Sequence, residues 1–136
     1  MSVDDDDTLR EILALDTIAV VGCSTSETKA AHTVPKYMRE HGYRIVPVNP
    51  YADEIFGRRA YDTLSEVEGD VDIVDVFRPT NEVPGIVDEA VGREEVDTIW
   101  LQLGITHDEA AQTAEEAGKR VVQDRCLRVE HQRLVE

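Results

Sequence analysis

The chain has 136 residues, of which 29 are Asp or Glu and 14 are Lys or Arg, so its formal net charge is −15. So acidic a chain does not fit nucleic acid or an anionic membrane surface, because both bind basic faces. No apolar run approaches the ~20 residues of a membrane span, and the acidic N-terminus is unlike a secretory signal. We therefore expect one cytoplasmic domain over residues 1–136, from a halophilic source whose salt screens the acidic surface.

The order of elements follows from hydrophobic periodicity and from capping residues. Short apolar, β-branched runs are typical of strands buried on both faces, and Ser or Thr three residues before Glu marks a helix start. In chain order we predict an acidic, disordered start (1–7), a helix from Thr8 to about Leu15, a strand (17–22), a helix (30–41), a strand (43–50), a short helix after Thr63, a strand (71–77), a helix (about 80–92), a strand (97–104), a helix from Thr106 to Gly118, a strand (120–124) and an ambiguous tail (125–136).

The alternation of strands with helices indicates an α/β fold. We predict a Rossmann-like open parallel sheet of about five strands, in the order 3-2-1-4-5, with helices on both faces and right-handed crossovers. Ligands of such sheets bind beyond the carboxyl ends of the strands, where the strand order reverses. For this order, that point lies between the first and fourth strands.

The residues after the strands favour an anionic ligand. Gly22 allows a tight turn and close approach of a phosphate, and Ser24 adds a hydroxyl before a helix N-terminus. Arg78 and Arg125 follow the third and fifth strands, although Arg125 also fits a structural role in fixing the tail. A dinucleotide fingerprint is absent, because the turn lacks G-x-G-x-x-G and Asn49 stands where an acid would meet the ribose.

Five motifs in order resemble the small single-domain CoA-binding proteins, which are similar to the N-terminal CoA-binding domain of the succinyl-CoA synthetase α subunit. The motifs are "VVGCS", "GYRIVPVNP", "VDIVDVFRP", "IWLQLGI" and "VVQDRCLRVEH". The resemblance covers about residues 8–132 and implies that coenzyme A, or an acyl-CoA, lies across the strand ends. With the two arginines above, the implied ligand-binding residues are Gly22, Cys23, Ser24, Lys29, Val48, Asn49, Pro50, Phe77, Arg78, Gln102 and Arg125.

One position departs from that family. Ala31-His32 stands where the family usually has a serine, near the start of the first crossover helix. The change removes a hydroxyl from the predicted phosphate contact, and His32 is a candidate to replace it. The missing acid after the second strand agrees with CoA, since an acid there would repel the 3′-phosphate.

Other reactive side chains are better explained as structural. We interpret Cys23 and Cys126 as small free thiols in apolar surroundings, with a redox pair or a mixed disulfide with CoA as the alternative. Asp72 and Asp75 point to opposite faces of their strand, so we expect capping or solvent exposure rather than a catalytic pair. The four histidines show no metal-ligand spacing.

The function predicted from the sequence is non-catalytic binding of CoA or an acyl-CoA, because no nucleophile–base pair is visible. Two alternatives remain open at this stage: an NAD(P)-dependent oxidoreductase on the same fold, and a regulatory subunit that has lost its ligand. The tail has no obvious place in the sheet, so a homodimer is also considered.

Overall fold

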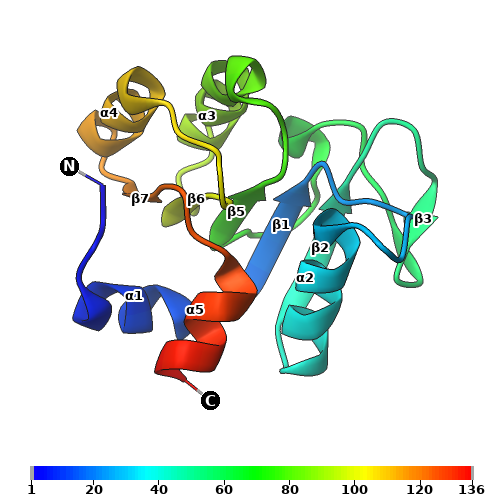
Figure 1. Ribbon diagram of the computed structural model, residues 1–136. Helices are drawn as coiled ribbons and strands as arrows, with labels where there is room; N and C mark the ends of the chain where they lie inside the picture. Colours follow the sequence, from blue (N-terminus) through cyan, green and yellow to red (C-terminus); the bar gives the residue numbers. More distant parts are fainter. Residues whose placement is uncertain (1, 136) are drawn as a thin grey trace.

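The computed structural model describes residues 2–135, which form an open sheet of five parallel strands. The order across the sheet is β2-β1-β5-β6-β7 (Figure 1). This confirms the predicted α/β, Rossmann-like class. The strands are β1 (Thr17–Val21), β2 (Arg44–Val48), β5 (Ile73–Val76), β6 (Thr98–Leu101) and β7 (Arg120–Val122).

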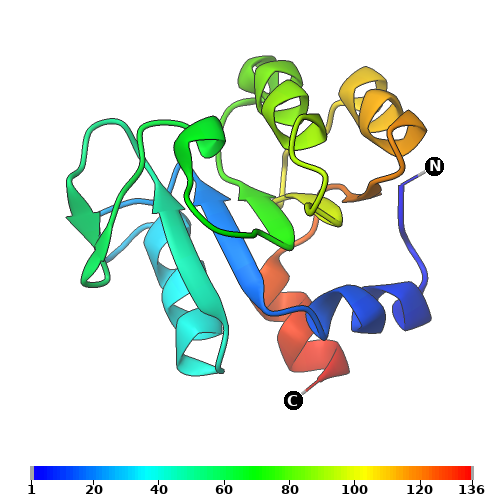
Figure 2. The ribbon, with the colours of Figure 1, turned by 180° about the vertical axis from the view of Figure 1, so that it is seen from behind.

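Helices cover both faces of the sheet, as predicted (Figures 1 and 2). One face carries α1 (Asp6–Leu13), α2 (Ala30–Glu40) and α5 (Leu127–Leu134), and the other carries α3 (Val83–Val91) and α4 (Asp108–Glu116). Each face buries its own apolar core, since every β1, β5 and β6 residue is buried. Short elements complete the fold: the β3 (Glu54–Ile55) and β4 (Arg58–Arg59) hairpin, and the 3₁₀ turns η1 (Leu64–Glu66) and η2 (Thr80–Glu82).

The predicted strand order, 3-2-1-4-5, is wrong, because the third long strand, β5, lies beside β1 rather than outside β2. A right-handed connection from β2 back across β1 must pass over the face opposite α2. It does so, and its Leu64 and Val67 pack in the core beneath α3. Asp72 then accepts hydrogen bonds from the backbone N–H groups of Asp16 and Thr17, which fixes β5 beside β1. The order therefore reverses between β1 and β5.

The acidic start is built into the fold, contrary to the expected disorder. The Val3 N–H donates to the Val121 carbonyl, and Asp5 caps α1 by accepting from the Thr8 N–H at 2.9 Å. Helix α1 thus begins at Asp6, two residues earlier than predicted, and Thr8 is not its cap. The N-cap of α4 is His107, one position after Thr106, where the helix was predicted to begin.

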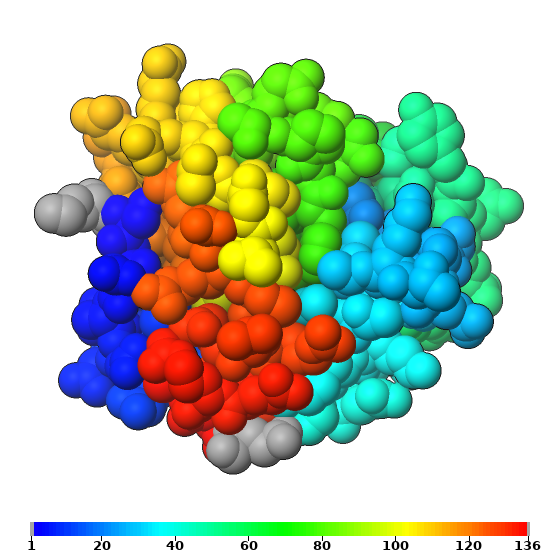
Figure 3. Space-filling model, viewed as in Figure 1, coloured from blue at the N-terminus to red at the C-terminus, as the bar shows by residue number. Residues whose placement is uncertain are grey.

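The ambiguous tail forms α5, which packs beside α1 and α2. Figure 3 shows the N-terminal and C-terminal segments side by side on this face. Since the tail has a place within one chain, it no longer gives a reason to expect a homodimer. Among residues 2–135, no helix is long and apolar enough to cross a bilayer.

The acidic side chains lie on the surface, as the composition requires. Of the 28 Asp and Glu residues that are described, 21 are exposed. Two exceptions are buried: Glu130, which pairs with two arginines, and Asp75, which has no hydrogen-bond partner among residues 2–135. A surface of this kind is destabilised by repulsion between like charges in dilute salt.

We expect the melting temperature to rise by more than about 4 °C between 0.1 M and 2 M KCl, corresponding to roughly 1 kcal/mol. At ~1 M salt the screening length falls to ~3 Å, so repulsion among the exposed carboxylates is largely removed. Loss of the surface ion pairs opposes this gain only weakly, since each contributes at most about 1 kcal/mol. Calorimetric melts across the KCl series test the prediction, and a flat or falling melting temperature would contradict it.

Candidate functional site

The turn after β1 brings three strand ends together. Gly22 has φ +90°, and its N–H donates to the Val48 carbonyl at 2.9 Å. A Cβ at this position would lie 2.7 Å from Cδ of Arg78 and 3.1 Å from the carbonyl oxygen of Phe77. Only glycine fits both the backbone conformation and this close approach of the β5 exit.

Two side chains fix the peptide groups that follow Gly22. Asn49 Nδ2 donates to the Cys23 carbonyl at 2.9 Å, and His32 Nδ1 donates to the Ser24 carbonyl at 2.7 Å. Within residues 2–135, no acceptor engages the N–H groups of Cys23 and Ala31. We call this segment the anion-binding turn, because free N–H donors and the positive end of the α2 dipole are features that suit an anion.

His32, the candidate to replace the family's serine at this helix start, already has two partners within the fold. Its ring packs against the ring of Phe56, 4.7 Å between centroids, and its Nδ1 is used by Ser24. The His32 side chain therefore stabilises the turn through its contacts with Ser24 and Phe56. Lys29, by contrast, lines the cavity and caps α2 with no side-chain hydrogen bond to the helix.

A cavity of about 570 Å³ opens beyond the carboxyl ends of β1, β2 and β5. The structure brings nine of the eleven sequence-predicted residues to it, so their meeting at one site follows from the fold. They are Gly22, Cys23, Ser24, Lys29, Val48, Asn49, Pro50, Phe77 and Arg78. Contact with a ligand remains a prediction for all of them.

Gln102 and Arg125 do not reach this cavity. Gln102 is buried, and its Oε1 accepts the Leu127 N–H at 3.1 Å at the start of α5. Arg125 pairs with Glu130 at 2.9 Å and with Asp4, beside a separate hollow of about 400 Å³. Both side chains contact the tail, as the structural interpretation of Arg125 expects, and their contact with a ligand stays a prediction.

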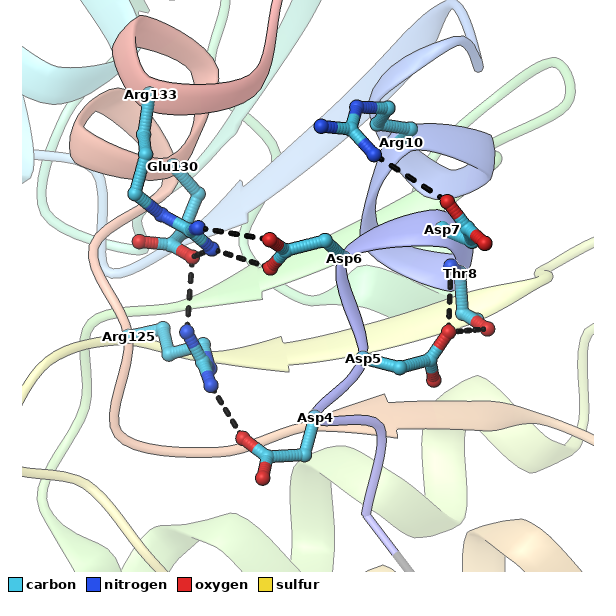
Figure 4. A network of polar contacts seen from close by, with 9 residues as sticks. All are labelled: Asp4, Asp5, Asp6, Asp7, Thr8, Arg10, Arg125, Glu130 and Arg133. Carbon is cyan, nitrogen blue, oxygen red and sulfur yellow. Dashed lines mark hydrogen bonds and ion pairs between the residues drawn. The ribbon is translucent and has the colours of Figure 1, made fainter.

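Figure 4 shows the network that holds Arg125. Glu130 lies between Arg125 and Arg133, and Arg133 also pairs with Asp6 at 2.8 Å. The hydrogen bond from Arg133 lowers the pKa of Asp6 below its ordinary value. The network ties the acidic start to α5.

Arg78 lies at the cavity in a bidentate pair with Glu82. Its Nε and Nη2 donate to the two carboxylate oxygens at 3.0 and 2.7 Å. Hydrogen bonding between them raises the pKa of Arg78 and lowers that of Glu82. Both side chains are nearly half exposed, so a phosphate can compete for the guanidinium at small cost.

Several cavity residues were missed by the sequence analysis. Tyr51 is 95% exposed at the cavity mouth, directly after Pro50. The short helix predicted after Thr63 is the 3₁₀ turn η1, which places Leu64 in the cavity wall. Ala31, where the sequence predicts a lost hydroxyl, also lines the cavity, and the other lining residues that were not predicted are Val21, Asp62, Thr63, Leu64, Glu82, Ile86 and Glu89.

Cys23 is a small buried residue, as we interpreted it. Its side chain is fully enclosed, and burial, with the nearby Asp75 as a lesser cause, raises the pKa of the thiol to about 12. A thiol in this state is not an effective nucleophile at neutral pH. Cys126 is half-buried, and neither cysteine forms a disulfide.

Comparison with known proteins identifies the family of this chain and several relatives. Residues 16–132 match the family described as CoA binding domain. The Bacillus subtilis protein YneT is 40% identical over 114 residues, 84% of either chain. The Thermus thermophilus structure "cell-free ID.343" has a TM-score of 0.91 and 43% identity, and the match covers 96% of this chain and 99% of that one. An Archaeoglobus fulgidus acetate–CoA ligase (ADP-forming) is 28% identical over 81% of this chain but only 17% of the ligase.

Proposed function

Because the chain belongs to the CoA-binding domain family, we propose that it binds coenzyme A or an acyl-CoA and catalyses no reaction of its own. The anion-binding turn carries this proposal. It combines the unpaired N–H groups of Cys23 and Ala31, the close approach that only Gly22 permits, and Arg78 at the adjoining strand end.

The fold suggests how the ligand would lie. In sheets of this kind, a pyrophosphate sits at the first turn and the adenosine lies across the end of the second strand. Here those places are the turn at Gly22–Ser24 and the segment Val48–Pro50. Asn49 occupies the position where a dehydrogenase has its acid, and its side-chain amide is already used by the Cys23 carbonyl and the Tyr51 N–H.

A thermal-shift series tests the proposal. We expect CoA or acetyl-CoA to raise the melting temperature in 1 M KCl, and NAD and NADP to have no effect. A ligand at 100 times its Kd stabilises the folded state by about 2.7 kcal/mol. A shift with NAD alone would support the oxidoreductase alternative, and no shift with any of the four would support a domain without a ligand.

We expect Arg78→Ala to weaken CoA binding by about 1.5–3 kcal/mol, the usual contribution of a hydrogen bond to a charged group. Glu82→Gln is the matched variant, because it frees the same guanidinium from its carboxylate. It should leave CoA affinity unchanged or tighter. Isothermal titration measures both, and an Arg78→Ala protein with wild-type affinity would remove Arg78 from the site.

A further inference from the structure

The two carbonyl groups that follow Gly22 are both occupied by side-chain donors. The Cys23 carbonyl accepts from Asn49 Nδ2 at 2.9 Å. The Ser24 carbonyl accepts from His32 Nδ1 at 2.7 Å. Because a carbonyl oxygen can only accept, Nδ1 of His32 carries the proton in this contact. Neither carbonyl is therefore free to turn toward an anion, which it would repel.

The contact with His32 also fixes the direction of the next N–H group. No peptide bond among residues 2–135 is cis, so the carbonyl of Ser24 and the N–H of Thr25 point in opposite directions. The Thr25 N–H is therefore directed away from the His32 ring. It has no acceptor within the described part of the chain, and Thr25 is exposed. The turn thus has a further free donor, two residues after that of Cys23.

The ring of His32 packs outside the cavity. Ser24 and Ala31 line the cavity, whereas His32, which directly follows Ala31, does not. The ring lies instead against Phe56 at the turn of the β3–β4 hairpin, with 4.7 Å between the two ring centres. An N–H group that points away from this ring is therefore turned toward the side of the Ser24 peptide on which a ligand in the cavity would lie.

Phe56, which packs on the His32 ring, has a strained backbone. Its φ is +57°, and left-handed backbone is unfavourable for a bulky side chain unless the surroundings impose it. The contacts that accompany the strain are both with α2: the His32 ring, and the guanidinium carbon of Arg39, 6.0 Å from the centre of the Phe56 ring. Packing of this kind restricts rotation of the His32 ring and so keeps Nδ1 on the Ser24 carbonyl.

We propose that His32 is a positioning residue of the anion-binding turn, and that it holds the Ser24 peptide so that the Thr25 N–H points at a phosphate of the ligand. The inference rests on the proposed function. In place of the hydroxyl that Ala31 lacks, the turn gains an oriented N–H group. Without the His32 donor, the Ser24 peptide can rotate and turn its carbonyl toward the phosphate, which replaces an attraction by a repulsion.

The test uses two substitutions of His32. His32→Asn keeps an N–H donor at the δ position, and His32→Leu keeps an apolar side chain at Phe56 but removes the donor. In isothermal titration we expect His32→Leu to bind CoA at least about tenfold more weakly, the effect of a lost hydrogen bond to a charged group. His32→Asn should restore affinity to within about threefold of the wild type.

His41→Leu is the matched control, and CoA affinity should not change in it. His41 is the C-cap residue at the opposite end of α2, and its Nδ1 makes the same kind of contact, with the Tyr37 carbonyl at 2.8 Å. Melting curves without ligand show whether each variant folds.

The amide signal of Thr25 provides a readout that a merely structural role of His32 would not change. In proton–nitrogen NMR spectra at saturating CoA, this signal should shift in the wild type and in His32→Asn, but not in His32→Leu. Wild-type affinity of His32→Leu, or equal losses in the two variants, would overturn the inference and leave the proposed function intact. So would a Thr25 signal that CoA does not move in the wild type. If the wild-type protein binds no CoA, the proposed function itself fails, and this inference fails with it.

Discussion

Replacing Asp75 by Asn is expected to raise the free energy of unfolding at pH 7, by roughly 1 kcal/mol or more. Asp75 lies on β5 between Val20 and Trp100, fully buried, and neither carboxylate oxygen has a hydrogen-bond partner. Burial raises its pKa well above the ordinary value for an aspartate. At neutral pH the folded protein must therefore take up a proton there or hold an unpaired charge, and Asn requires neither.

The same substitution should change the pH dependence of stability. Because the folded-state pKa of Asp75 is raised, its stabilising effect is complete below the unfolded pKa of about 4. The effect is lost as pH rises through the folded-state pKa, by up to about 1.4 kcal/mol per pH unit. Asp75→Asn removes this loss, so the difference between variant and wild type should grow as the pH is raised from 4. Denaturant unfolding at several pH values measures it.

Asp72→Ala is the control for this prediction. Asp72 lies just ahead of the same strand, but its carboxylate accepts two backbone N–H groups. Its removal should lower stability by about 1 kcal/mol, opposite in sign to Asp75→Asn. An Asp75→Asn protein that is less stable than the wild type at pH 7 would contradict the prediction.

Hydrophobic periodicity was sufficient to predict the helices and the five long strands, but not the order of those strands in the sheet. The five buried apolar runs and the helices between them were predicted correctly, because each is encoded locally. The position of β5 depends on Asp72 meeting residues 16 and 17 and on η1 crossing the α3 face, and neither interaction has a local signature.

In the candidate site, too, the features that are encoded locally could be predicted, and those that depend on distant segments could not. Residues next to a strand end, such as Gly22, Asn49 and Arg78, could be assigned to the site from the sequence, because the carboxyl ends of parallel strands lie at the same edge of the sheet. Gln102 and Arg125 also follow strands, but α5 occupies their side chains. The sequence allowed this role for Arg125, but it gave no sign of it for Gln102, because the tail itself was unassigned. We expected Asp75 to cap a backbone group or to face solvent, and it does neither. Alternation along a strand cannot show which face of the sheet is covered by helices.

Gly22→Ala is expected to abolish the thermal shift with CoA. The substitution places an L-residue at φ +90° and a Cβ 2.7 Å from Arg78 Cδ and 3.1 Å from the Phe77 carbonyl oxygen. The arginine side chain can move, but the carbonyl belongs to the β5 exit, so the turn and the strand end must separate. Left-handed backbone alone costs about 1–2 kcal/mol, and the displaced turn no longer presents its N–H groups beside Arg78.

Gly104→Ala distinguishes the effect of the left-handed backbone from the effect of the close contact between the new Cβ and the end of β5. Gly104 follows β6 at φ +85°, nearly the same strained conformation, but its Cβ would meet no atom within 4 Å. The left-handed backbone should therefore lower the stability of both variants by a similar amount, about 1–2 kcal/mol. Only Gly22→Ala should also lose its thermal shift with CoA. If the two variants respond to CoA alike, the close approach of β1 and β5 is not what forms the ligand site, and the anion-binding turn would have to be placed elsewhere along the strand ends.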